Sequence, residues 1–108
     1  MSNWRDIKYY GFWDQPRTFH TLGGEQAFLF DCQFDESLDD YPSIYRVYGI
    51  PHSDLSDLHT LLNQLSTKSS YFLGTLALPQ SAFDKTLRKQ IDLAILSELT
   101  PADDRGRA

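Results

Sequence analysis

Cysteine is almost absent from this sequence, and long apolar runs are missing. The single cysteine, Cys32, permits no intrachain disulfide, so the fold must rest on its hydrophobic core. No segment approaches the roughly 18 apolar residues of a membrane-spanning helix. The first residues lack the basic region and apolar run of a secretory signal. These absences predict a cytoplasmic protein that does not enter a membrane.

Basic residues are also few. Ten lysines and arginines stand against fifteen acidic residues, which gives a formal charge of −5. Nucleic acids and anionic membranes both require clustered basic side chains, and here they are scattered. We therefore expect neither as a partner, whereas a basic protein would be attracted electrostatically.

Cofactor and metal motifs are missing as well. The sequence contains no phosphate-binding loop, dinucleotide fingerprint or Gly-x-Ser-x-Gly. Gly23 and Gly24 are typical of a hairpin turn. No helix follows them, so they do not form a phosphate-binding site. His20, His52 and His59 lack the spacing of a zinc site, so structural or surface roles are expected. The sequence predicts no cofactor and no metal.

Aromatic residues make up 14% and hydrophobic residues 41%, as in a folded domain. We expect one domain over residues 1–100 and a flexible tail over 101–108. Strand-like patterns cover 8–13 and 17–22, which are one extended run interrupted at Pro16, and then 26–34, 43–50 and 71–78. The clearest alternation places Phe28, Phe30, Cys32 and Phe34 on one face, which we expect in the core. Burial there predicts an unreactive Cys32 thiol.

The second half shows helical spacing. Ser53 would cap a first helix with an apolar stripe at Leu55, Leu58, Leu62 and Leu65. Asp84 would cap a second helix to about Leu99, burying Leu87, Ile91, Ala94 and Ile95. Strands followed by helices predict an α+β fold, with an antiparallel sheet of about four strands and two helices. A strongly curved, half-open barrel is a variant of this arrangement.

Acidic residues are concentrated in one short segment. Five of the fifteen, Asp31, Asp35, Glu36, Asp39 and Asp40, lie within residues 31–40. The segment could be a solvated loop that blunts strand pairing, a surface for a basic partner, or a cation site. It lacks the glycine and the spacing of a calcium-binding EF-hand loop.

Aromatic side chains crowd the first strand: Trp4, Tyr9, Tyr10, Phe12 and Trp13. One face of a short strand cannot bury all five. They indicate either a recognition or dimer surface or a core corner packed on both sides of a thin sheet.

Three functions follow from these features. The leading hypothesis is a protein-interaction or accessory module, with a basic protein partner and a possible homodimer. Its surface would comprise Trp13, Arg17, Asp35, Glu36, Asp39, Asp40 and Tyr41. The alternative is a small enzyme that draws on Asp31, Asp35, Asp39, His20 and Arg17 around a cleft. The third is a structural subunit that self-associates through an exposed sheet edge.

Overall fold

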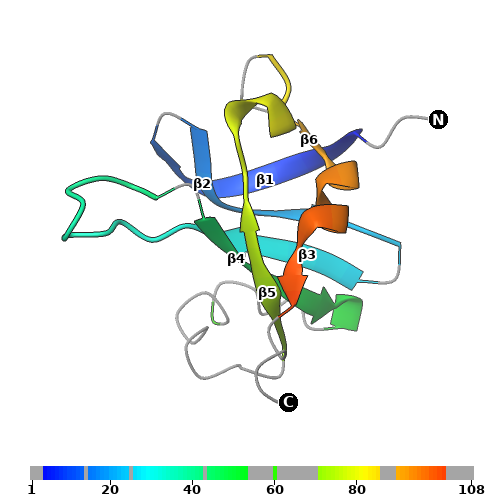
Figure 1. Cartoon of the computed structure of the whole chain (residues 1–108). Helices are drawn as coiled ribbons and strands as arrows, with labels where there is room; N and C mark the ends of the chain where they lie inside the picture. The colour runs from blue at the N-terminus through cyan, green and yellow to red at the C-terminus, as the bar shows by residue number, and fades with distance from the viewer. Residues whose placement is uncertain are drawn as a thin grey trace.

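The protein is built around one antiparallel sheet of seven strands, in the order β6-β1-β2-β3-β4-β5-β7 (Figure 1). The computed structural model describes residues 4–13, 15–24, 26–42, 44–53, 60, 71–85 and 90–101. The strands are β1 (Trp4–Trp13), β2 (Gln15–Leu22), β3 (Gln26–Asp31), β4 (Ile44–Pro51), β5 (Phe72–Ala77), β6 (Gln90–Asp92) and β7 (Thr100–Pro101). Two 3-10 helices, η4 (Gln80–Ala82) and η5 (Leu93–Glu98), lie between the later strands.

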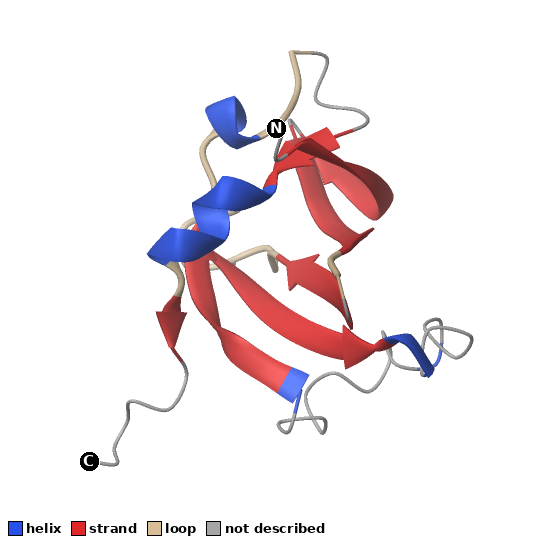
Figure 2. Cartoon of the chain, turned by 90° about the vertical axis from the view of Figure 1, so that its right-hand side faces the viewer, coloured by secondary structure: helices blue, strands red, loops and turns tan. Residues whose placement is uncertain are grey.

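The sheet curls into a half-barrel (Figure 2). Strands β1 to β5 form a meander, in which each strand pairs with the next. Phe19 and Phe30 are fully buried on the inner face, and their rings stack with centroids 4.7 Å apart. Tyr45 and Val47 of β4 belong to the same cluster. Large cross-strand contacts of this kind are what stabilises a sheet without disulfides.

Residues 90–101 connect the two ends of the sheet. β6 pairs with β1, whereas β7 pairs with β5, so one short segment supplies both outer strands. η5 lies between them and packs Leu93, Ile95 and Leu96 against the core. Gly74 has a φ of 151°, and a Cβ there would overlap the Thr100 carbonyl oxygen. The close contact of β7 with β5 therefore requires glycine at this position.

The expected α+β fold with two helices is wrong. The elements that the structure describes are strands and 3-10 helices, and none of these elements is an α-helix. The expected helix from Asp84 fails because Ile91 is fully buried in β6, paired opposite Arg5. The residue that caps a helix in this segment is Asp92, and the capped helix is η5. The Asp92 side chain accepts a hydrogen bond from the Ala94 amide at 3.0 Å. Strand pairing at both ends of the segment thus overrides its helical spacing.

Several predicted features lie outside the described residues. They are the leucine stripe at Leu55, Leu58, Leu62 and Leu65, the expected surface or structural His59, the expected core residue Leu87, and residues 102–108 of the expected tail. Pro101, at the start of that tail, pairs with Gly74 in the sheet.

The outer face of the central strands is also buried. Ala27, Leu29, Tyr48 and Ile50 form a second apolar cluster, each with at most 2% of its surface exposed. Strand β3 therefore buries both of its alternating sets of side chains, whereas the sequence favoured one face.

Tyr45 and Gln15 form a buried group of hydrogen bonds on the inner face. The Tyr45 hydroxyl donates to the Pro16 carbonyl at 2.6 Å and accepts from Gln15 Nε2 at 2.9 Å. Gln15 Nε2 also donates to the Leu78 carbonyl at 3.1 Å. Burial raises the pKa of Tyr45 to about 12, because the phenolate would lose hydration there. The buried hydroxyl is thus neutral and hydrogen-bonded.

Candidate functional site

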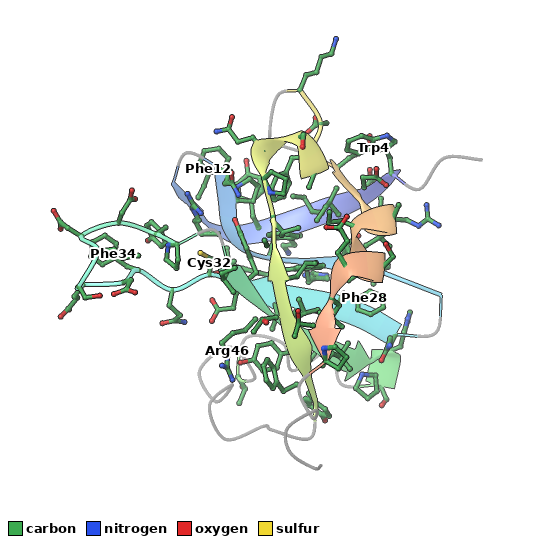
Figure 3. All side chains as sticks on the ribbon, viewed as in Figure 1. Trp4, Phe12, Phe28, Cys32, Phe34 and Arg46 are labelled. Carbon is green, nitrogen blue, oxygen red and sulfur yellow. The ribbon has the colours of Figure 1, made fainter. Side chains whose placement is uncertain are left out.

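The β3–β4 hairpin continues beyond its paired strands as an arm that projects from the body (Figures 1 and 3). We call residues 33–42 the acidic arm. β3 ends at Asp31 and β4 begins at Ile44, while the arm is closed by an isolated bridge between Asp35 and Asp40. The Asp35 amide donates to the Asp40 carbonyl at 2.9 Å. The arm is therefore an ordered extension of the hairpin.

Side chains inside the arm hold its turn. Asp35 Oδ1 accepts hydrogen bonds from the Ser37 amide at 2.9 Å and the Ser37 hydroxyl at 2.7 Å. These bonds hold the pKa of the Asp35 carboxyl below its ordinary value. Asp39 adopts a φ of 56°, a left-handed conformation that an aspartate tolerates. Local hydrogen bonds thus hold the turn at the far end of the arm.

The arm exposes both charged and apolar side chains. Glu36, Asp39 and Asp40 are exposed and Asp35 is half-buried. Leu38 at the tip is 58% exposed, and Phe34 is 48% exposed. Because ordered, exposed apolar groups ringed by charges are typical of recognition sites, this combination matters more than the acidity alone.

Arg17 and Tyr41 anchor the base of the arm. The Arg17 guanidinium carbon lies 4.8 Å from the centre of the Tyr41 ring. Tyr41 is half-buried, and its ring meets Phe34 edge-on with centroids 5.3 Å apart. Arg17 was expected on the interaction surface, but it is only 9% exposed. Its guanidinium supports the Tyr41 ring from the protein interior.

Cys32 completes this base. Its thiol donates to the Pro42 carbonyl at 3.0 Å, and Arg17 Nη1 lies 3.8 Å from its sulfur. Burial raises the pKa of the Cys32 thiol, an effect that the nearby Arg17 charge partly offsets. Cys32 is 3% exposed, which confirms the expected burial. A protonated, enclosed thiol is a structural group.

A groove of about 430 Å³ runs from the arm onto the outer face of the sheet. It is lined by Asp31, Gln33, Phe34, Asp35, Glu36, Pro42, Ile44, Arg46 and Thr75. Ile44 is 50% exposed there. The Arg46 guanidinium carbon lies 4.2 Å from the centre of the Phe72 ring, and its Nε donates to the Tyr48 hydroxyl at 2.9 Å. The groove therefore combines carboxylates, apolar side chains and one aromatic-stacked cation.

Sequence reasoning missed Phe34, Leu38, Ile44 and Arg46. Alternation placed Phe34 in the core with Phe30, but β3 ends at Asp31, and Cys32 is the last residue of the pattern that is buried in the core. The sequence signal for an exposed Phe34 was the run of acidic residues that begins at Asp35, because a segment rich in carboxylates is rarely buried in a core. Trp13, also expected at the site, is placed by its backbone at the end of β1, opposite Gln15.

The groups named for an enzyme do not share one site: Asp31 and Asp35 both line the groove, whereas Arg17 and His20 are not among its lining residues. Arg17 contacts Cys32 on the inner face, whereas His20 bonds the Tyr10 hydroxyl through Nδ1 at 2.7 Å on the outer face. Asp31 is buried and accepts from Thr18 at 2.9 Å. Asp35 has a pKa lowered by its hydrogen bonds, opposite to the shift that a general acid at neutral pH requires. Within the described ranges, no group of three or more histidine, cysteine or acidic side chains could hold a metal ion.

Comparison with known protein families, with curated proteins and with solved structures finds no match. In the part of the chain that the structure describes, no helix is long and apolar enough to cross a membrane.

Proposed function

We propose that the chain is a protein-interaction module that binds a basic, partly apolar segment of a partner protein with its acidic arm and the adjoining groove. The observation that carries the proposal is the ordered projection of Asp35, Glu36, Asp39 and Asp40 beside the exposed Phe34. Carboxylates attract and orient a basic partner, whereas the apolar side chains slow its release.

The geometry favours a partner segment in which basic and bulky apolar side chains alternate. A leucine-sized side chain would lie in the groove between Phe34 and Ile44, and lysine or arginine would reach Asp35 and Glu36. The internal hydrogen bonds of the arm lower the entropy lost on binding, because the arm is ordered beforehand.

The proposal is tested with a synthetic peptide amide of alternating arginine and leucine. Amide chemical shifts of the ¹⁵N-labelled chain should move within residues 33–46, with an apparent Kd that weakens as salt is raised. The matched control peptide carries glutamate in place of arginine and should not bind. Equal responses to both peptides, no response at all, or shifts centred elsewhere would overturn the proposal.

A charge-neutral variant identifies the arm as the cause. Glu36→Gln, Asp39→Asn and Asp40→Asn together remove three exposed charges without altering side-chain shape. We expect at least a ten-fold weaker Kd and an unchanged unfolding midpoint. The matched control neutralises Glu98, an exposed acid of η5, as Glu98→Gln, and should leave the affinity unchanged.

A further inference from the structure

Arg46 lies on the sheet side of the groove and is held there by two aromatic residues (Figure 3). Its guanidinium carbon lies 4.2 Å from the centre of the Phe72 ring, and its Nε donates to the Tyr48 hydroxyl at 2.9 Å. Arg46 is nevertheless exposed. A planar cation held in this way loses little side-chain entropy when it binds a ligand, because it is already ordered.

Arg46 has no acidic partner among the residues that the structure describes. Asp31 is paired opposite it on β3. The two carboxylate oxygens of Asp31, however, accept hydrogen bonds from Thr18 at 2.9 Å and from Gln33 at 2.6 Å. An exposed arginine without an ion pair is available to an anion from outside the chain, and its terminal nitrogens match the two oxygens of a carboxylate.

Thr75 and Ile44 extend this site on either side of Arg46. Thr75 of β5 is paired opposite Arg46, and both line the groove. Side chains paired on one face lie about 5 Å apart, so the Thr75 hydroxyl and the guanidinium can donate to one carboxylate. Ile44, two residues before Arg46, lies about 7 Å along the same face of β4 and is 50% exposed. The carboxylate and the side chain of a single terminal residue can therefore contact Arg46 and Ile44 together.

We infer that the groove binds the C-terminus of its partner, with the terminal carboxylate on Arg46 and Thr75 and a leucine-sized last side chain in the apolar part of the groove. This inference rests on the function proposed above and adds a direction to it. The basic residues that precede the terminus then lie along the acidic arm, at Asp35 and Glu36. The reverse direction would bring the carboxylate next to these two acids, which would repel it.

Nearby charge and solvent limit the strength of this contact. Asp31 is the cross-strand neighbour of Arg46, so its charge lowers the positive potential that a ligand carboxylate meets. Arg46 is also exposed, and water and salt screen an ion pair there. We therefore expect the free carboxylate to tighten binding about five-fold, as a well-placed surface ion pair does.

Three peptides that share one alternating arginine–leucine sequence test the inference. The first ends in leucine as the free acid, and the second ends in the same leucine as the amide. The third adds an aspartate after that leucine and ends as the amide, so its carboxylate belongs to a side chain. The first should bind about five-fold more tightly than the second and the third. It should also shift the Arg46 Nε–H resonance of the ¹⁵N-labelled chain. A free acid that gains nothing over the amide overturns the inference, and equal binding of the first and third peptides overturns the assignment to a chain terminus.

Variants of the chain assign the gain to Arg46. In Arg46→Gln, the free acid should bind no more tightly than the amide, because the other charged residues described along the groove are acidic. Arg46→Lys keeps the charge without the planar donors and should retain part of the gain. Thr75→Val should reduce the gain, since it removes one donor, and an unchanged gain would exclude this hydroxyl from the site. The matched control is Arg5→Gln, which removes a positive charge from an exposed position of β1 outside the groove and should keep the full difference. A gain that persists in Arg46→Gln contradicts the inference.

The same titrations separate this inference from the function on which it rests. If the amide shifts residues 33–46 and the free acid gains nothing, the acidic arm binds basic segments and the carboxylate site is wrong. If neither peptide shifts these residues, the function proposed above fails and the inference fails with it.

Discussion

The paired strands of the β3–β4 hairpin and its acidic arm differ in burial and in the contacts that hold them, although they are continuous in sequence. In the paired half, Phe30, Tyr45 and Val47 are fully buried and the strands are joined by a regular ladder. In the acidic arm, Leu38 and Phe34 are about half exposed, and local hydrogen bonds hold the turn. The division falls at Asp31, where the ladder ends.

This difference means that the paired strands stabilise the fold, whereas the arm is available for the proposed binding. Buried apolar area supplies most of the free energy of folding, and the arm contributes little of it. The arm can therefore carry mutually repelling carboxylates at small cost to the fold. The experiments below compare the two halves directly.

The largest expected difference is between two phenylalanines four residues apart. Phe30→Ala should lower the free energy of unfolding by about 3–5 kcal/mol, because it leaves a cavity in the stacked core. Phe34→Ala should cost less than about 1 kcal/mol, since that ring is half exposed. Urea unfolding of both variants provides the measurement. Similar losses would show that the arm is part of the core.

A smaller effect is expected from one buried hydroxyl. Tyr45→Phe should cost about 1–3 kcal/mol at neutral pH, because Gln15 and the Pro16 carbonyl lose a hydrogen-bonding partner. The control is Tyr9→Phe, an exposed tyrosine that should change stability by less than about 0.5 kcal/mol.

The same tyrosine should make the fold sensitive to alkali. Its pKa is about 12 in the folded chain against an ordinary 10.0, so the unfolded chain ionises first as pH rises. Stability should be retained below pH 10 and fall as pH rises towards 12, by about 2 to 3 kcal/mol from this group. Unfolding curves across this interval should show a shallower decline in Tyr45→Phe. Identical declines in the two chains would refute the assignment.

The smallest effect concerns the turn of the arm. Ser37→Ala removes the hydroxyl that donates to Asp35, so the pKa of Asp35 should rise toward its ordinary value. A lowered carboxyl pKa stabilises the fold above the ordinary value and is lost as pH falls through the folded pKa. The variant should therefore lose less stability on acidification. Carboxyl resonances followed by NMR report the pKa, and an unchanged titration would show that the hydroxyl has no effect.

The sequence predicts the strands of the first half well. It does not predict the secondary structure of segments that pair with strands remote in sequence. Alternation over residues 26–31, and the turn at Gly23 and Gly24, correspond to the β2–β3 hairpin. Residues 90–98, which form β6 and η5, were predicted as part of a helix, because the spacing near Ile91 is ambiguous and the strand that pairs with β6 is remote in sequence.

The candidate site was predictable in part. The acids of the arm were visible as a charge cluster. The inward orientation of Arg17 was not, because an arginine beside aromatic residues fits a surface anchor as well as a buried cation beneath a ring. Exposure of Phe34 depended on where β3 ends, and strand boundaries are poorly marked by alternation alone.

Amide hydrogen exchange across the β3–β4 hairpin tests the central claim most directly. The claim is that one hairpin divides into a structural half and a locally held, binding-competent arm. Strong protection should extend over residues 26–31 and 44–51, and it should fall steeply over the acidic arm, whose bonds can open without unfolding the core. Uniform protection from residue 26 to residue 51 would contradict the division and make the arm part of the core.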